Sequence, residues 1–191
     1  MIQVENLYKS FGDLEVLKEV DLEIEDGETI AIIGRSGSGK SVLMKHLVGL
    51  LKPDQGRVLV DDVDIGEIPY EELREIRQQF GVLFQGGALF DSMTSFENIA
   101  FPLEYFTAMS DDAIQDRVHE CLDLVRLSDV GPKKPSELSG GMRKRVALAR
   151  AIALEPRYML YDEPTSGLDP ETSNTIDELI SQLSEELSVT S

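Results

Sequence analysis

The sequence has one cysteine, no tryptophan and half as many basic as acidic residues. A single thiol, Cys121, cannot form an internal disulfide, and its place in the apolar helical pattern of 113–125 predicts a buried side chain rather than a reactive one. Eighteen Lys and Arg against 36 Asp and Glu give a formal net charge of −18. Binding to nucleic acid needs a basic surface that displaces counterions, so this balance argues against a nucleic-acid partner.

Long apolar runs are also missing. None approaches the roughly 20 residues that a membrane-spanning helix needs. The first residues lack a basic stretch followed by an apolar core, so we expect no signal peptide. If the protein serves a membrane process, we expect it at the cytoplasmic face, peripheral to the membrane and bound through a partner. A length of 191 residues suits one domain.

Apolar periodicity predicts strands and helices in alternation, which is typical of an α/β fold. Alternation along 16–24 predicts a half-buried strand, and the continuous apolar run 29–33 predicts a strand buried on both faces. A glycine-rich loop and a helix with Val42, Leu43, Leu47 and Leu50 on its apolar side follow. Further strands are expected at 56–60, 80–84 and 158–161, and helices within 92–127 (with Ser110 as an N-cap), at 141–154 and at 176–187.

Residues 34–41 read GRSGSGKS and match the phosphate-loop pattern G-x-x-x-x-G-K-[ST]. Glycines let backbone N–H groups wrap phosphate oxygens, and the following helix points its positive end at the same anion. A chance Gly/Ser turn would not explain Lys40 and Ser41 between a strand and a helix. We expect Lys40 to reach the β- and γ-phosphates and Ser41 to ligate Mg²⁺. The predicted nucleotide-binding residues here are Gly34, Ser36, Gly37, Ser38, Gly39, Lys40 and Ser41.

The predicted strand 158–161 runs directly into Asp162 and Glu163. Acids at the end of a buried strand are costly unless a cation or polar site lies beside them. Asp162 is expected to hold Mg²⁺ and Glu163 to polarise an attacking water. By itself this pair could be a solvated strand end. After a phosphate loop, it favours hydrolysis of a nucleoside triphosphate over transfer to a second substrate.

Residues 138–151 read LSGGMRKRVALARA, a Ser/Gly turn that enters a helix N-terminus and so suits an anion. This stretch resembles the signature motif of ABC ATPases and its helix. The resemblance covers the chain and implies an α/β P-loop NTPase (RecA-like) core with an N-terminal antiparallel β subdomain and an inserted helical subdomain. It implies one nucleotide-binding domain, with the core at 1–87 and 155–191 and the helical subdomain at 88–154.

The resemblance also assigns roles. In the family, the signature contacts the γ-phosphate of ATP held by a second subunit, which implies a head-to-tail homodimer with two composite sites. Phe11 matches the aromatic that stacks on adenine, although it could instead be a core phenylalanine. Gln85 matches the Q-loop glutamine that joins Mg²⁺ and senses the membrane partner, and 166–169 matches the D-loop. The residues expected to bind ATP therefore also include Phe11, Val16, Ser139, Gly140, Gly141 and Asp169. The expected Mg²⁺ ligands are Ser41, Gln85 and Asp162. The expected catalytic residues are Glu163, Lys40 and Gln85.

Two local features narrow the resemblance. Met142 stands where the family usually has glutamine, and both this position and the segment 86–103 are similar to the ATPases of Mce/Mla-type systems, which move phospholipids or other lipids between bacterial membranes. In the family, an integral-membrane permease docks on this segment. An apolar surface there would then be a binding face. The alternative is that these residues pack the helical subdomain of another importer or exporter.

The family carries a switch histidine on a strand beyond the last predicted helix. His46 and His119 lie on predicted helices and are expected to be ordinary helix residues, so neither can serve as the switch histidine. We therefore expect a chain truncated relative to the family, with an exposed apolar strand edge, intact ATP binding and impaired hydrolysis. Two other classes stay open: a soluble ABC protein of DNA repair or translation, which usually has a coiled coil or a second cassette, and a module that binds ATP without turnover.

Overall fold

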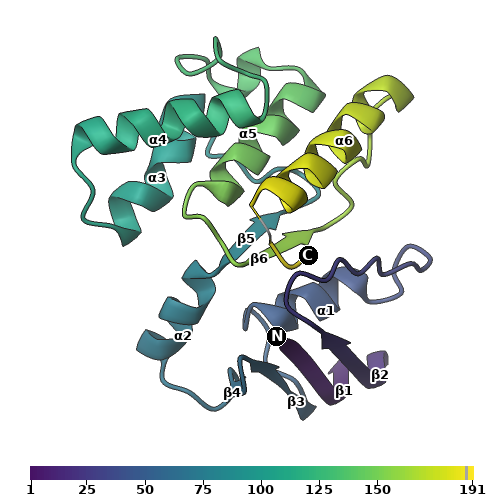
Figure 1. Ribbon diagram of the computed structural model, residues 1–191. Coiled ribbons are helices and arrows are strands. Elements are labelled where there is room, and N and C mark those ends of the chain that lie inside the picture. The colour runs from purple at the N-terminus through teal and green to yellow at the C-terminus, as the bar shows by residue number, and fades with distance from the viewer. Residues whose placement is uncertain (188) are drawn as a thin grey trace. The chain divides into compact units, whose positions relative to one another are not determined.

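The computed structural model describes residues 1–187 and 189–191, and the chain divides into two compact units (Figure 1). The first unit contains residues 1–80 and 190–191, and the second contains residues 81–189. Each unit has its own strands, helices and buried residues. The division into a core of 1–87 and 155–191 and a helical subdomain of 88–154 stays a prediction.

The first unit contains an antiparallel sheet of four strands in the order β2-β1-β3-β4. β1 (Ile2–Phe11) pairs with β2 (Leu14–Ile24) on one side and with β3 (Gln55–Val60) on the other, and β4 (Val63–Asp64) extends the sheet beyond β3. Ile2 and Val4 lie opposite Val60 and Val58, and all four side chains are buried. This alternation places one face of the sheet in the core. The strands predicted at 16–24 and 56–60 are confirmed.

Two helices complete this unit. α1 (Lys40–Leu47) buries Leu43 and Leu47, as predicted, but Leu50 lies beyond the helix end and is 51% exposed, so its predicted place on the apolar side is wrong. α2 (Tyr70–Gln78) returns toward α1. The Arg77 guanidinium donates to the carbonyls of Val48 and Gly49 at 3.0 and 2.7 Å. It thereby satisfies acceptors that the end of α1 leaves open.

The strand predicted at 29–33 is absent from the described residues, and this prediction is wrong. Ile33 is 93% exposed, and the run has no regular secondary structure. Two backbone hydrogen bonds join the start of this run to the last residue of the chain: Ile30 N–H donates to the Ser191 carbonyl at 2.7 Å, and Ser191 N–H donates to the Glu28 carbonyl at 2.9 Å. A strand requires a neighbour that continues the hydrogen-bonded ladder, which an apolar run cannot provide for itself.

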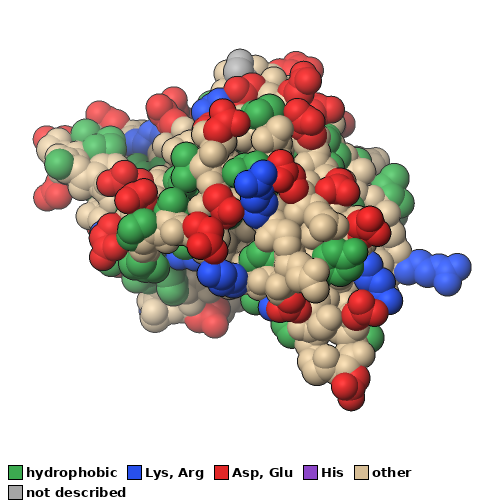
Figure 2. Space-filling view, turned by 90° about the horizontal axis from the view of Figure 1, so that it is seen from below, with side chains coloured by type: hydrophobic (Ala, Val, Ile, Leu, Met, Phe, Trp, Pro, Cys, Tyr) green, Lys and Arg blue, Asp and Glu red, His purple; other side chains and the backbone are tan. Residues whose placement is uncertain are grey.

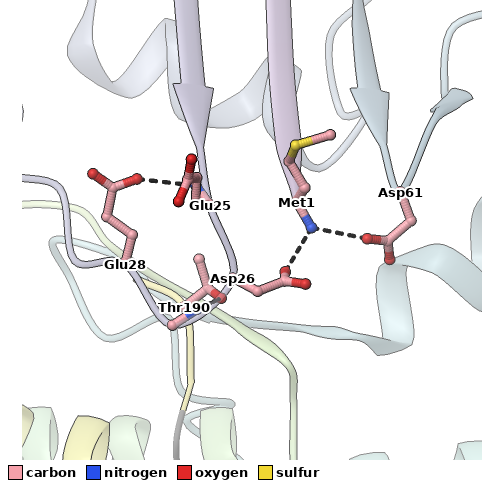
Figure 3. A network of polar contacts seen from close by, with 7 residues as sticks. Met1, Glu25, Asp26, Glu28, Asp61 and Thr190 are labelled. Atoms are coloured by element: carbon pink, nitrogen blue, oxygen red, sulfur yellow. Dashed lines mark hydrogen bonds and ion pairs between the residues drawn. The ribbon is translucent and has the colours of Figure 1, made fainter.

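Polar contacts join the chain ends of this unit (Figure 3). The Met1 ammonium donates to Asp26 Oδ1 at 2.6 Å and to Asp61 Oδ1 at 2.9 Å. Burial lowers the pKa of this amine, but the two hydrogen bonds outweigh it, so that the net pKa is raised. Gly27 N–H donates to Thr190 Oγ1 at 2.8 Å, which fastens the turn after β2 to the last residues of the unit.

The second unit joins a pair of strands to a group of helices. β5 (Phe80–Leu83) and β6 (Tyr158–Tyr161) form a two-stranded sheet. Around a common apolar core pack α3 (Ser95–Phe106), α4 (Asp111–Leu124), α5 (Gly140–Ile152) and α6 (Pro170–Glu186), with a short 3-10 helix at Pro135–Glu137 (Figure 1). The predicted strands at 80–84 and 158–161 are confirmed. The core includes Leu83, Ile99, Leu103, Val118, Leu122, Leu148, Ile152, Met159, Leu179 and Leu183.

Each of these helices begins at a side chain that accepts a hydrogen bond from the first turn. The N-caps are Thr94 in α3, Ser110 in α4, Ser139 in α5 and Asp169 in α6. Such caps stabilise a helix by about 1 kcal/mol each. Ser110 is the cap that the sequence predicted. Cys121 on α4 is fully buried, as expected, and burial raises the pKa of its thiol to about 11.

Acidic side chains are spread over the face drawn in Figure 2, with fewer Lys and Arg among them. Most of the acidic residues of the chain are solvent-exposed. The negative charge is therefore a property of the solvated surface rather than of the core.

Candidate nucleotide-binding site

The phosphate loop lies in the first unit and turns closely over β2. Gly39, the residue before α1, has φ 96°, a conformation that side chains other than glycine rarely adopt. A Cβ at Gly39 would lie 2.9 Å from Leu17 Cδ2 and 3.0 Å from Val16 Cγ1. Two residues of the predicted ATP set, Val16 and Gly39, are thus in direct contact. Residues 34–38 of the loop are exposed.

Lys40, the first residue of α1, points its side chain back into the loop. Its ammonium donates to the carbonyls of Gly34 and Arg35 at 3.0 and 3.2 Å. The basic residue, the exposed backbone of the loop and the N-terminus of α1 are therefore gathered in one place. This is the arrangement with which a phosphate loop holds a polyphosphate.

Phe11 ends β1 at the hairpin to β2 and is 48% exposed. The Lys9 ammonium lies 5.7 Å from the centre of its ring. The alternative that Phe11 is a core phenylalanine is therefore wrong. An exposed ring can stack on a base, so the assignment to adenine stays a prediction that the geometry permits.

The paired strands of the second unit bring predicted catalytic residues together. Asp162 N–H donates to the Leu83 carbonyl at 2.9 Å, so the residues after β5 and after β6 are neighbours. The Gln85 amide donates to Glu163 Oε2 at 3.1 Å and to Ser166 Oγ at 3.3 Å. Glu163 itself has φ 47°, a strained backbone conformation of the kind that occurs at functional sites.

Lys144 is a residue of this cluster to which the sequence assigned no role. It lies on α5, is 6% exposed, and its ammonium donates to the Gln85 carbonyl and, at 3.5 Å, to the Glu163 carbonyl. Burial lowers the pKa of Lys144, and the negative charges of Asp162 and Glu163 oppose that effect. The available signal in the sequence was a lysine six residues after the start of the signature motif, in the basic run Arg143–Arg145.

The signature turn lies against the D-loop and the first turn of α6: a Cβ at Gly140 would lie 3.4 Å from Leu168 Cδ2. Ser139 caps α5 and accepts from Met142 N–H at 3.2 Å. A Cβ at Gly141 would lie 2.4 Å from Thr172 Cγ2, so a larger residue here would force Thr172 to shift. Thr172 in turn donates to Asp169, from its N–H at 3.0 Å and from its hydroxyl at 2.6 Å. These hydrogen bonds, led by that of the hydroxyl, lower the pKa of the Asp169 carboxyl.

The expected Mg²⁺ ligands have suitable chemistry. Ser41, Gln85 and Asp162 offer a hydroxyl, an amide oxygen and a carboxylate, which are the oxygen donors that Mg²⁺ accepts alongside phosphate and water. Gln85 and Asp162 follow neighbouring strands in the second unit, whereas Ser41 belongs to the first. Among the residues that the structure describes, no three His, Cys, Asp or Glu side chains form a metal-binding group by themselves. The Mg²⁺ set stays a prediction.

Hydrogen bonds fix the start of the segment 86–103, and aromatic rings lie along this segment and the end of α3 beyond it. The buried Asn98 exchanges hydrogen bonds with the backbone of Phe90. The Arg150 guanidinium donates to the carbonyls of Gly87 and Ala88 at 3.0 and 2.9 Å. We call the rings of Phe90, Phe101, Tyr105 and Phe106 the aromatic surface: successive ring centres lie 5.0, 6.1 and 4.8 Å apart, and Phe90 and Tyr105 are 42% and 61% exposed.

The two histidines lie on helices, as predicted. His46 is buried in α1, where its Nδ1 lies 2.8 Å from the Val42 carbonyl and burial lowers its pKa. His119 is exposed on α4, edge-on to Phe96. In the part of the chain that the structure describes, no helix is both long and apolar enough to cross a bilayer.

Comparison with known proteins decides the family. A family model described as ABC transporter matches residues 17–166. The chain belongs to the ABC transporter family. It is an ABC ATPase domain with the P-loop NTPase fold, mixed α/β with an antiparallel β subdomain and a helical region.

Three similar proteins are informative about this ABC domain. It is 48% identical to the probable ribonucleotide transport ATP-binding protein mkl of Mycobacterium leprae, over 99% of this chain and 54% of that protein. It is 42% identical to the intermembrane phospholipid transport system ATP-binding protein MlaF of Haemophilus influenzae, over 100% and 72%. The dimeric ADP- and Pi-bound cassette MJ0796 matches with a TM-score of 0.89 and 37% identity, over 97% and 84%. The chain thus spans about half the length of mkl.

Proposed function

We propose that this chain is the ATP-binding and ATP-hydrolysing subunit of an ABC transporter. The observation that carries the proposal is the contact of Gln85 with Glu163 at the ends of paired strands, 3.1 Å from amide to carboxylate. A carboxylate held in this way can accept a proton from an attacking water. Together with a phosphate loop, this pair favours hydrolysis over simple nucleotide binding.

Each residue has a defined task in this proposal. The loop N–H groups and Lys40 bind the β- and γ-phosphates, Phe11 stacks on adenine, and Val16 supports the loop beneath Gly39. Glu163 orients and deprotonates the attacking water, and Gln85 holds the Glu163 carboxylate through its amide. Mg²⁺ held by Ser41, Gln85 and Asp162 would neutralise charge on the phosphate oxygens.

Hydrolysis is proposed to occur in a head-to-tail dimer. Ser139 and Gly141 stand at the N-terminus of α5, whose first turn has no acidic residue, so its positive end suits the γ-phosphate of ATP on a second copy. The related cassette MJ0796 is described as dimeric and bound to ADP and Pi. Asp169 lies beside this turn through Thr172 and would face the same interface.

Hydrolysis of Mg²⁺-ATP across a range of protein concentrations tests these proposals, with Lys40→Ala as the background. A working composite dimer gives turnover that rises faster than linearly with protein concentration and disappears in Lys40→Ala. Turnover proportional to protein concentration would overturn the dimer. Bound ATP with no turnover, at any protein concentration, would favour the other reading, a nucleotide-binding module without hydrolysis.

The cargo is proposed to be a lipid, with a membrane permease docked near residues 86–103, where the aromatic surface begins. Exposed rings at Phe90 and Tyr105 offer apolar area that a partner would cover, and peripheral attachment at the cytoplasmic face would follow. Met142 and the segment 86–103 resemble Mce/Mla-type ATPases, and MlaF is a relative named for phospholipid transport. The name of mkl refers instead to ribonucleotides, so the cargo needs its own test.

Copurification identifies the permease. We expect the wild-type chain to retain an Mce-type permease and Tyr105→Ser to lose it, because Tyr105 is the most exposed ring of the aromatic surface. A matched control is Tyr70→Ser, which removes a ring of similar exposure from α2. Exclusive recovery of an amino-acid or metal permease would contradict the lipid assignment.

A further inference from the structure

Lys144 is a buried cation that donates hydrogen bonds to the backbone of the catalytic pair. Its ammonium reaches the backbone carbonyls of Gln85 and Glu163, which lie 78 residues apart in sequence. The side chains of the same two residues meet at 3.1 Å. One lysine on α5 therefore binds the backbone carbonyls of both residues, and the side chains of the same two residues bind one another.

A lysine is well suited to this position. An ammonium has three donors and no acceptor, so it can satisfy two carbonyls at once. Burying a charge is costly unless it is compensated, and here the carbonyl dipoles and the negative charges of Asp162 and Glu163 stabilise it. A neutral apolar side chain would leave these carbonyls without the donor that fixes them. The geometry of Gln85 and Glu163 thus depends on a residue of a different element.

Lys144 also connects this pair to the signature motif. It lies on the first turns of α5, the helix that Ser139 caps and Gly141 begins. We propose that Lys144 is a positioning residue for ATP hydrolysis, which acts through Gln85 and Glu163 and makes their placement depend on the position of α5. The inference rests on the proposed function. When the signature turn contacts the γ-phosphate, α5 shifts, and Lys144 on this helix shifts Gln85 and Glu163 with it.

Two arginines on α5 clarify what is particular to Lys144. Arg150 donates to the carbonyls of Gly87 and Ala88 and so fixes the segment after Gln85, without reaching Glu163. Arg145 donates to the carbonyls of Val125 and Arg126, at the end of α4. Arg145 is therefore a matched control, since it is a part-buried cation on the same helix that binds two backbone carbonyls outside the catalytic cluster.

The test compares Lys144→Met, Lys144→Arg and Arg145→Met in steady-state ATP hydrolysis and nucleotide binding. We expect kcat to fall about 10- to 100-fold in Lys144→Met, the scale on which misplacement of a catalytic group costs rate. KM and the Kd for ATP should change by less than about twofold, because the nucleotide is held elsewhere. Lys144→Arg should recover part of kcat, and Arg145→Met should retain it. Equal kcat losses in Lys144→Met and Arg145→Met would overturn the inference.

Hydrogen–deuterium exchange supplies a readout that does not require turnover. We expect Lys144→Met to speed amide exchange in the peptides around 84–88 and 161–165, with unchanged exchange in α4, and Arg145→Met to show the reverse. If the wild-type chain fails to hydrolyse ATP, the proposed function fails, and this exchange pattern alone decides the role of Lys144. Unchanged exchange in both peptides would overturn the positioning role, whatever the turnover.

Discussion

The amide of Gln85 donates to the carboxylate of Glu163 at 3.1 Å, across the ends of β5 and β6. The two residues come from segments far apart in the chain, and the pairing of the strands makes them neighbours. Gln85 directly precedes the segment 86–103, so a movement of that segment displaces the residue that binds the proposed catalytic base. If the proposed permease shifts this segment, the orientation of the Glu163 carboxylate changes with it.

Glu163→Gln tests the role of Glu163 as a base separately from its role as a hydrogen-bond acceptor. The new amide oxygen can still accept from Gln85, but it cannot take a proton from water. We expect turnover to fall about 10²- to 10⁴-fold while the Kd for ATP stays the same, since general-base catalysis contributes on this scale. Turnover and ATP binding are measured together, with Glu185→Gln on the exposed face of α6 as the control. A Glu163→Gln protein with wild-type turnover would exclude Glu163 as the base.

Gly141→Ala tests the close approach of the signature turn to α6. The added methyl would lie 2.4 Å from Thr172 Cγ2, so we expect the free energy of unfolding to fall by about 1–3 kcal/mol, the usual cost of overpacking. Gly140→Ala is the matched control, because its methyl would meet Leu168 at an ordinary 3.4 Å. Unfolding is followed in denaturant by circular dichroism.

A second substitution decides whether the clash is the cause. Thr172→Ser removes Cγ2 and keeps the hydroxyl that donates to Asp169. The pair Gly141→Ala with Thr172→Ser should therefore recover most of the lost stability. If the double variant is as unstable as Gly141→Ala alone, the loss arises from the backbone of the turn and not from this contact.

Local patterns predicted most of the elements but not their long-range partners. The helix caps at Ser110 and Ser139 and the apolar stripe around Cys121 depend on a few neighbouring residues, so the sequence was sufficient to locate those helices. The run 29–33 has the composition of a buried strand, yet it forms no strand in the described residues because a ladder needs a second segment. Composition alone does not specify that segment.

The same distinction applies to the site. The phosphate loop is contiguous, so its residues could be named from their spacing. The role of Gln85 required a resemblance to a family, and its contact with Glu163 was not predicted, because nothing in either segment specifies the other. Lys144 was missed because its partners are backbone carbonyls, which leave no trace in the identity of Gln85 or Glu163. Such contacts are visible only once the fold brings the segments together.

Cys121 gives a prediction for alkaline pH. Burial raises the pKa of its thiol from 9.0 to about 11, so the unfolded chain releases this proton at lower pH than the folded one. The contribution of the thiol to stability is full below pH 9 and is lost as pH rises toward 11, by about 2 kcal/mol. Between pH 8 and pH 10.5, the free energy of unfolding should fall more in the wild type than in Cys121→Ala, which has no titrating group at this position. Equal slopes would show that the thiol does not contribute.

Phe11→Ala tests the proposed contact with adenine. The ring is exposed at the end of β1, so its removal should leave the fold intact and weaken ATP binding by about 1–3 kcal/mol, the usual worth of stacking a base on an aromatic ring. Leu14→Ala is the control, because Leu14 pairs with Phe11 in the hairpin and is 67% exposed without a ring. Binding of ATP and of inorganic triphosphate is compared by calorimetry. Loss of ATP affinity with unchanged triphosphate affinity assigns Phe11 to the base, and an equal loss for both ligands contradicts the stacking role.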